Sequence, residues 1–317
     1  MKPYLLGDIG GTNARFALCE QGSIGPIERS HTADLPTFLD AVDAYLAPRG
    51  GRSGIAGAAI AVAGPVANGR CRLTNSSWTV DQEALRQALH LPDVIVVNDF
   101  AAIARSLPRL GKADLVAIGG GKAAPGEPAL VFGPGTGLGV ACLFGGAEGD
   151  IVIPSEGGHA TLAGTNECQD ALIRHLRSRY GHVSAERVLS GGGLVALYDG
   201  IATLDRKIVA VRDAAAITNA ALEGSCEVCR AALDMFCAIL GNVAGSLALT
   251  FGARGGVYIA GGIVPRFPAH LARTEFRGQF EAKGRYQPYL QNVPTWVITH
   301  PEAAMVGLSS MIGKSIL

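Results

Sequence analysis

The sequence has no surplus of charge of either sign. Its 317 residues include 27 Lys and Arg and 27 Asp and Glu, so the formal net charge is zero. A protein that binds nucleic acid through its phosphates usually needs a surplus of basic residues. The composition therefore argues against a nucleic-acid partner, and any selectivity for an anion must come from a local site.

The N-terminus lacks the apolar stretch that a signal peptide or a bilayer-spanning helix requires. Lys2 is followed by a short apolar run over residues 4–6 and then by a polar loop. We therefore expect a cytoplasmic protein without a membrane partner. With 48% hydrophobic and 17% charged residues, the composition favours a folded protein with many buried strands over a disordered chain.

A disulfide framework is also missing. The seven cysteines are an odd number and lie in apolar surroundings, which is typical of reduced, buried thiols. Only Cys226 and Cys229 have metal or redox spacing, and they lack a second Cys pair or a nearby His pair. Because residues 226–237 have a helical pattern instead, we expect no zinc here, and the pattern assigns this pair no other role.

Strand-like and helical patterns alternate along the chain, which predicts an α/β fold. We expect strands at 4–18 (as a β-hairpin), 55–62, 94–97, 130–132, 140–144, 257–260 and 296–298, and helices at 35–48, 81–89, 100–107, 167–179, 228–251 and 301–311. The length suggests two domains, with a boundary near residues 110–112. We expect a small domain over 1–109, completed by a C-terminal helix over 299–317, and a large domain over 110–298.

Residues 8–13 have the composition of a loop that holds a phosphate. Gly10 and Gly11 let backbone N–H groups approach an anion, and Thr12 and Asn13 add neutral donors. Asp8 would repel a phosphate unless a divalent cation or its water shell lay between them, so the loop also predicts Mg²⁺. A plain hairpin turn is the alternative, because Gly-Gly is also a turn dipeptide.

A second glycine-rich loop covers residues 133–139 and follows a predicted strand, as the first loop does. Gly135, Thr136 and Gly137 lie inside it, and the repeated order of strand, loop and strand is a weak internal repeat. Its alternative is a flexible turn. Neither loop has the spacing of a P-loop or of a Rossmann fingerprint, so the sequence supports neither of those nucleotide sites.

Three polar groups downstream are candidates for chemistry, and the first two each have two interpretations. Asn98 and Asp99 follow a β-branched strand, where an Asp is either a helix cap or a general base for a hydroxyl that attacks a phosphoryl group. Glu156 and His159 flank two glycines, which suits either a polyol ligand or a surface turn. Glu186 by itself has the pattern of a solvated helix residue.

Six motifs occur together at 8–15 (DIGGTNAR), 97–100 (VNDF), 135–139 (GTGLG), 156–159 (EGGH), 182–190 (HVSAERVLS) and 261–267 (GGIVPRF). In this order and spacing the sequence resembles the bacterial glucokinases over nearly its whole length. The resemblance implies the actin-like ATPase fold, which is ribonuclease H-like, with two α/β domains and a cleft between them. It also implies a homodimer that phosphorylates glucose at its 6-hydroxyl with ATP, as in glycolysis.

Carried onto this sequence, the resemblance makes Asp99 the catalytic base. It assigns the sugar to a polar set consisting of Asn75, Asn98, Asp99, Glu156, His159 and Glu186. It assigns the phosphates to Asp8, Gly10, Gly11, Thr12, Asn13, Gly135, Thr136 and Gly137, the adenosine to Gly261 and Gly262, and Mg²⁺ to Asp8 through water.

Two differences from the related repressor and kinase group indicate which branch of the family the sequence resembles. That group usually carries a Cys-rich zinc motif after its Gly-His pair, whereas here only Cys168 follows, and no helix-turn-helix segment precedes the first loop. We therefore expect the non-zinc glucokinase branch and not a transcriptional repressor. Two alternatives stay open, a kinase of the same fold for another hexose or amino sugar and a non-catalytic module that binds nucleotide or sugar.

Overall fold

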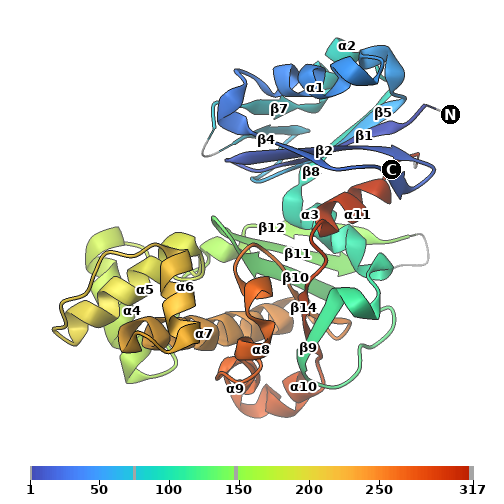
Figure 1. Ribbon diagram of the computed structural model, residues 1–317. Coiled ribbons are helices and arrows are strands. Elements are labelled where there is room, and N and C mark those ends of the chain that lie inside the picture. The colour runs from blue at the N-terminus through green and yellow to red at the C-terminus, as the bar shows by residue number, and fades with distance from the viewer. Residues whose placement is uncertain (1, 74–75, 146–148, 314–317) are drawn as a thin grey trace. The chain divides into compact units, whose positions relative to one another are not determined.

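The chain forms two compact units, each built on its own six-stranded sheet with helices packed against it (Figure 1). The computed structural model describes residues 2–73, 76–145 and 149–313. Unit 1 comprises residues 1–111 and 300–317, and unit 2 comprises residues 112–299. The predicted α/β class is therefore confirmed.

The sheet of unit 1 has a parallel half and an antiparallel half. Its path is β3-β2-β1-β5-β8, with β4 also paired to β2. The neighbours β1, β5 and β8 run parallel, whereas β2 returns antiparallel to β1, which gives the predicted hairpin. The strands are β1 (Tyr4–Ile9), β2 (Asn13–Glu20), β3 (Ser23–Ile24), β4 (Glu28–His31), β5 (Gly57–Val62) and β8 (Asp93–Asn98), and a separate two-stranded ribbon is made by β6 (Arg70–Arg72) and β7 (Thr79–Asp81).

Helices cover both faces of this sheet. Alternation along β1 sends Leu5 into one buried cluster and Leu6 into another, one on each face. The first cluster includes residues of α1 and α2, and the second includes residues of α3 and α11, which lie on the other side of the sheet in Figure 1. The four helices are α1 (Phe38–Leu46), α2 (Gln82–Leu89), α3 (Asp99–Ser106) and α11 (Ala303–Ser309).

Helix α11 brings the C-terminal end of the described chain back onto unit 1. It contacts α3, β1 and β5, and Met305 and Leu308 are fully buried there. At Gly307 a Cβ atom would overlap the carbonyl oxygen of Ala102 in α3, so the two helix backbones touch where only glycine fits. This close packing fixes α3, the helix that begins at the candidate base Asp99.

The sheet of unit 2 repeats the arrangement of unit 1. The antiparallel hairpin of β10 and β11 is followed in the sheet by β13 and β14, which run parallel to β10. The full order is β12-β11-β10-β13-β14-β9. The strands are β9 (Leu115–Gly119), β10 (Ala129–Pro134), β11 (Leu138–Phe144), β12 (Ile151–Ser155), β13 (Gly256–Ile259) and β14 (Thr295–Ile298). The weak internal repeat in the sequence thus corresponds to a repeated strand topology.

Helix α7 is the central helix of unit 2. Its Phe236 and Leu240 are fully buried in one cluster with Phe132 of β10 and Val257 of β13. Among the described helices, α7 alone has the length and apolar composition to cross a membrane, but 67% of its most apolar window is buried inside the protein. It is therefore a core helix.

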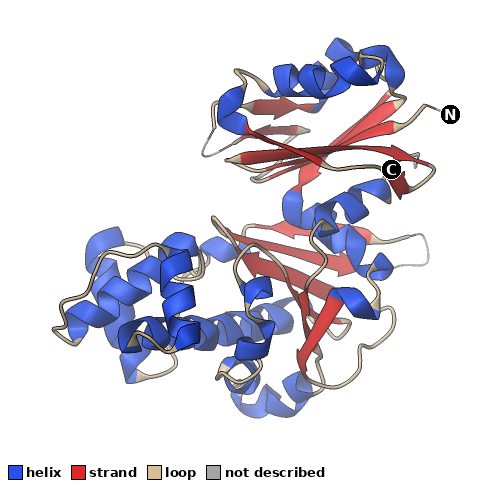
Figure 2. Ribbon diagram, in the orientation of Figure 1, coloured by secondary structure: helices blue, strands red, loops and turns tan. Residues whose placement is uncertain are grey.

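Unit 2 contains α7 and other helices that are short or lie around it (Figure 2). They are α4 (Glu167–Tyr180), α5 (Gly191–Leu204), α6 (Ala214–Glu223), α7 (Glu227–Phe251), α8 (Pro268–Leu271), α9 (Phe276–Glu281) and α10 (Gln287–Gln291). Short 3-10 turns occur at η1 (Thr32–Asp34), η2 (Ala47–Arg49), η3 (Arg52–Gly54), η4 (Leu107–Arg109), η5 (Lys112–Asp114), η6 (Gly157–His159), η7 (Val264–Arg266) and η8 (Gly284–Tyr286).

Candidate functional site

In unit 1, the first glycine-rich loop and Asp99 emerge at the same edge of the sheet. Ile9, Val62 and Asn98 are register partners across the parallel strands β1, β5 and β8. Strands in a sheet are about 4.8 Å apart, so the ends of β1 and β8 lie about 10 Å from each other. Ligands of open α/β sheets bind at this carboxyl edge. The predicted phosphate loop and the predicted base are thus neighbours.

The loop of residues 10–12 is held by its own backbone and by Thr32. The Gly10 N–H donates to the carbonyl of Asn13 at 2.8 Å. Thr32, which is buried, donates its hydroxyl to the carbonyl of Gly11 at 2.9 Å and its N–H to the carbonyl of Thr12 at 3.0 Å. The loop is therefore a rigid turn with Thr12 exposed at its tip.

A hollow of about 810 Å³ lies beside this tip. Its lining comprises Gly11, Thr12, His31, Thr32, Ala33, Asp34, Leu35, Pro36, Ser76 and Ser77. The predicted sugar residue Asn75 directly precedes two of these residues but lies outside the part of the chain that the structure describes.

Asp8 belongs to a chain of four alternating charges in unit 1. Arg15, its register partner on β2, donates from Nη1 to Asp8 Oδ2 at 2.7 Å. The Nε of Arg15 lies 3.6 Å from Glu302 Oε2, and Glu302 also pairs with Arg29. Burial raises the pKa of Asp8 and the nearby Glu302 adds to this, while the guanidinium of Arg15 opposes both. Two acids and two bases thus form a neutral group beneath the loop.

We expect Arg15→Met to lower the free energy of unfolding by about 2 kcal/mol, because it leaves the carboxylate of Asp8, only 16% exposed, without its counter-charge. Chemical denaturation of Arg15→Met, Asp8→Asn and the double variant measures this. The double variant should be more stable than the sum of the two single losses predicts. Strictly additive losses would show that the pair contributes no coupling.

The structure separates the two interpretations of Asn98 and Asp99. Asn98 is the residue that caps α3, since its Oδ1 accepts from the N–H groups of Phe100 at 3.0 Å and Ala101 at 3.1 Å. Its Nδ2 donates to the carbonyl of Gly64 at 3.1 Å. Asp99 is the first residue of the helix, is half-buried, and accepts from the Phe100 N–H at 2.9 Å. The capping role therefore falls on Asn98, and the role of Asp99 as general base stays a prediction.

In unit 2, the second glycine-rich loop packs against the predicted adenosine segment. Phe132 and Ile259 are partners on the parallel strands β10 and β13, so the segments that follow both strands leave the sheet at one edge. At Gly133 a Cβ would overlap the carbonyl of Ala260, and Gly261, with a φ of +85°, lies against the carbonyl of Pro134. Backbone thus contacts backbone here, and the remaining loop is residues 135–137.

The sequence did not indicate that the start of α5 also lies beside this loop. Ser190 caps the helix by accepting from the Gly193 N–H at 3.0 Å, and the Gly191 N–H donates to the carbonyl of Gly135 at 2.9 Å. A Cβ atom added at Gly192 or at Gly262 would touch no other atom, so space is open beside both glycines. Glycine in the first turn of a 14-residue helix beside a phosphate-type loop is a signal for anion binding.

Glu156, His159 and Glu186 form one polar cluster in unit 2. The Nε2 of His159 lies 3.7 Å from Glu156 Oε2, and its Nδ1 lies 3.8 Å from Glu186 Oε1. The side chains of Glu156 and His159 are 58% and 57% exposed, whereas that of Glu186 is 30% exposed. Glu186 lies in a turn, so its interpretation as a solvated helix residue was wrong. A cluster of two acceptors around one switchable ring suits a polyol.

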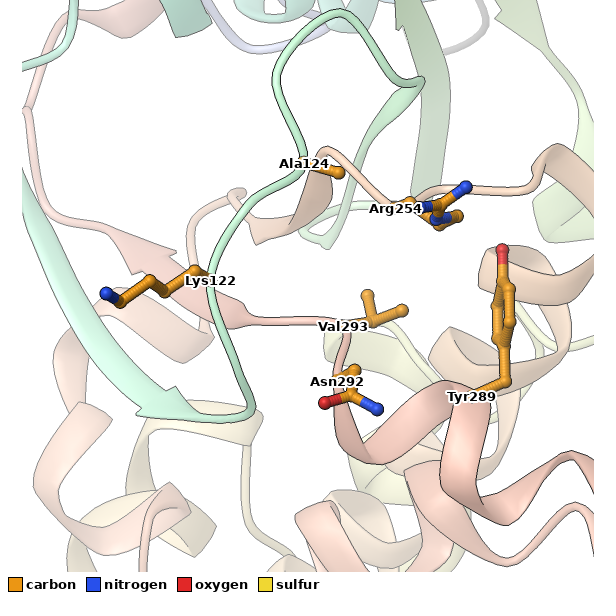
Figure 3. Close-up of a pocket in the computed structure, with 6 residues that line it drawn as sticks. All are labelled: Lys122, Ala124, Arg254, Tyr289, Asn292 and Val293. Atoms are coloured by element: carbon orange, nitrogen blue, oxygen red, sulfur yellow. The ribbon is translucent and has the colours of Figure 1, made fainter.

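A second hollow in unit 2, of about 430 Å³, lies at the other end of the sheet (Figure 3). Arg254 lies two positions before β13 and Val293 two positions before β14, so this hollow is at the amino ends of the parallel strands. Its other lining residues are Lys122, Ala124, Tyr289 and Asn292. It includes no residue of the predicted site, and the glycine-rich loops leave the sheet at the opposite edge.

The residues that the structure describes hold no cluster of three or more His, Cys, Asp or Glu side chains suited to a metal ion. Cys226 caps α7, since its Sγ accepts from the Cys229 N–H at 3.4 Å, and Cys229 is buried. The cysteine pair is thus part of a helix start.

Comparison with known proteins gives one consistent result. The family model described as Glucokinase matches residues 5–315. The glucokinase of Paramagnetospirillum magneticum is 45% identical over 311 residues, which are 97% of each chain. The glucokinase of Psychromonas ingrahamii is 42% identical over 314 residues, covering 98% of this chain and 97% of its own.

Solved structures agree. A glucokinase from an Antarctic psychrotroph is 38% identical, with a TM-score of 0.87 over 99% of this chain and 100% of its own. A ROK family glucokinase from Streptomyces griseus, solved with glucose and AMPPNP, is 20% identical, with a TM-score of 0.67 over 98% of each chain. The second likeness establishes the fold, which is the actin-like ATPase fold of these sugar kinases.

Proposed function

The chain belongs to the glucokinase family and is a glucose kinase that uses ATP; we propose that Asp99 accepts the proton of the 6-hydroxyl as that oxygen attacks the γ-phosphoryl group. The observation that carries this proposal is the shared register of Ile9, Val62 and Asn98, which puts Asp99 beside the phosphate loop of unit 1. A positioned carboxylate is a suitable general base for such a transfer.

The family resemblance assigns the sugar to a set of polar residues, and the geometry of three of them supports this part of the proposal. Unit 2 supplies Glu156, His159 and Glu186, whose distances of 3.7 and 3.8 Å leave them outside ordinary hydrogen-bond range of one another. Their polar atoms therefore have capacity for hydroxyl groups. On the basis of the family resemblance alone, the proposed sugar set also includes Asp99, Asn98 and Asn75.

The phosphates are bound in this proposal mainly by backbone N–H groups. In unit 1 the candidate donors belong to residues 11–13, and in unit 2 to residues 136 and 137, because the N–H groups of Gly10 and Gly135 already donate within their own loops. The adenosine is proposed to lie near Gly261 and Gly262. The support is the absence of room for a side chain at Gly133 and Gly261, which brings the two loops of unit 2 together as one glycine surface. Such a surface admits a polyanion closely.

Mg²⁺ fits this arrangement as a partner of Asp8. Magnesium in kinases is usually held by one or two carboxylates together with substrate phosphates, which agrees with the lack of a larger acidic cluster among the described residues. When bound, Mg²⁺ supplies positive charge that offsets the charge developing on the transferred phosphoryl group. Because Arg15 already occupies Oδ2 of Asp8, we propose that Asp8 holds the ion through water.

We also propose that the protein is a cytoplasmic homodimer, on the basis of the family resemblance. Sedimentation velocity of the purified protein, with and without glucose, measures the oligomeric state directly. A single species of about one chain mass under both conditions would contradict the dimer.

A coupled assay over a panel of sugars tests the proposed function. Glucose, mannose, fructose and N-acetylated amino sugars are each offered with ATP, with and without Mg²⁺. We expect turnover with glucose and Mg²⁺ at the highest kcat/KM of the panel. A higher kcat/KM with another hexose would identify that hexose as the preferred substrate. If no sugar led to nucleotide consumption, the assignment of the protein as a kinase would be wrong.

A further inference from the structure

Glu186 touches the phosphate loop of unit 2 as well as the polar cluster. Its Oε2 accepts a hydrogen bond from the N–H of Leu138 at 2.9 Å, while its Oε1 lies toward His159 at 3.8 Å. Leu138 is the first residue of β11 and the partner of Pro134 at the end of the hairpin ladder. One carboxylate thus reaches the two groups of residues assigned to different substrates.

The loop is shaped around this carboxylate. A Cβ at Gly137 would come within 2.5 Å of Glu186 Oε2, so any side chain there would displace the carboxylate from the Leu138 N–H. The Gly135 N–H donates to the carbonyl of Gly137 at 2.8 Å, which closes the turn just before Leu138. The position of the Glu186 carboxylate therefore requires glycine at 137.

The backbone of Glu186 is itself fixed to the segment that carries His159. The Glu186 N–H donates to the carbonyl of Gly158 at 2.9 Å, and the Ala185 N–H donates to the carbonyl of Ala160 at 3.0 Å. A Cβ at Gly158 would overlap the carbonyl of Leu138, so this segment also packs directly on the start of β11. The carboxylate cannot shift far without moving either the loop or the cluster.

We propose that Glu186 is a positioning residue for the loop of residues 135–139, and that sugar binding stiffens this loop through the Glu186 side chain. The proposal rests on the proposed function, because it takes Glu186 as a sugar ligand and the loop as a phosphate ligand. A hydroxyl bound at Oε1 restrains the carboxylate, and the restrained carboxylate holds the Leu138 N–H more firmly. By linkage, nucleotide bound to the loop then raises the affinity for sugar to the same degree.

Two substitutions at Glu186 separate its roles. Glu186→Gln keeps a carbonyl oxygen that can accept from Leu138 but loses the charge, whereas Glu186→Ala loses both. We expect Glu186→Ala to weaken binding of a non-hydrolysable ATP analogue about tenfold in the absence of sugar, and Glu186→Gln to weaken it by less than about twofold. Both should weaken glucose binding. Glu156→Ala is the matched control, since its described partner is His159 and it should weaken glucose binding alone.

Hydrogen exchange over residues 135–139 gives a readout that does not depend on activity. In the native protein we expect protection of this segment, with further protection when glucose is added. Glu186→Ala should lose both the protection and the response to glucose. Gly137→Ala should show the same losses although Glu186 is present. This second variant keeps the test possible if Glu186→Ala does not fold.

Unchanged exchange and unchanged nucleotide affinity in Glu186→Ala would overturn the proposal, and the native protein would still phosphorylate glucose in the sugar panel. If the proposed function itself is wrong, the native protein will show no turnover in the sugar panel, so the two failures can be told apart. Native turnover together with loss of loop protection in Glu186→Ala supports both.

Discussion

Asp99→Ala is expected to lower kcat for glucose phosphorylation by about 10²–10⁴-fold, the usual contribution of a general base. The 6-hydroxyl is a weak nucleophile until its proton is accepted, and in our proposal Asp99 accepts it. Glucose affinity should change far less, because the other residues of the sugar set remain. Steady-state kinetics with saturating ATP, together with calorimetric titration of glucose, measures both quantities.

Asp99→Asn is the control for this prediction. Its side-chain oxygen can still accept from the Phe100 N–H, so the start of α3 is preserved while the basic group is removed. We expect Asp99→Asn to fold as the native protein does and to be as inactive as Asp99→Ala. Asn98→Ala should differ, with a stability loss of about 1 kcal/mol from the missing cap. Turnover near the native rate in Asp99→Asn would remove Asp99 from the mechanism.

Removal of divalent cations is expected to lower turnover by about a thousandfold or more, since the developing phosphoryl charge would then lack several kcal/mol of stabilisation. Asp8→Asn should shift the Mg²⁺ concentration needed for half-maximal rate upward, because the carboxylate proposed to hold the hydrated ion is lost. Titration of Mg²⁺ at fixed ATP, with nucleotide binding followed by fluorescence of a labelled analogue, measures this shift.

Thr32→Val distinguishes an effect on the bound ion from an effect on the structure of the loop. It removes the hydroxyl that braces Gly11 without changing any charge, so it should weaken nucleotide binding at every Mg²⁺ concentration. Asp8→Asn should weaken it only where Mg²⁺ limits binding. The same Mg²⁺ dependence in Asp8→Asn as in the native protein would contradict the assignment of the ion to Asp8.

Sequence periodicity predicted the elements whose residues face one uniform environment. The core helix α7 and the parallel strands β5 and β13 have continuous apolar runs, and each was found within a few residues of its observed bounds. Helix α5 was missed because it starts with three glycines, which ordinarily end helices. Strand β12 was missed because its apolar run, Ile151 to Ile153, is only three residues long and is followed by Pro154, and all five of its residues are exposed or half-buried.

In the candidate site too, the sequence predicted only features that depend on residues adjacent in the chain. Asp8 and the glycine-rich loops can be recognised because their chemistry is local, with carboxylate, glycines and hydroxyl adjacent in the chain. Glu186 lies 48 positions from Leu138, and Thr32 lies 21 positions from Gly11, so only the folded chain shows what they hold. Long-range hydrogen bonds to backbone leave no periodic trace in a sequence.

The packing of α11 on unit 1 sets an order for the assembly of the nascent chain. Unit 2 is one continuous stretch of polypeptide, whereas unit 1 is made from two stretches on either side of it. When the ribosome has delivered residues 1–299, one face of the first sheet, with Leu6 and Ile95, still lacks Met305 and Leu308 to cover it. Unit 2 can therefore complete its core during translation, whereas this face of unit 1 stays only partly covered until residues 303–309 emerge.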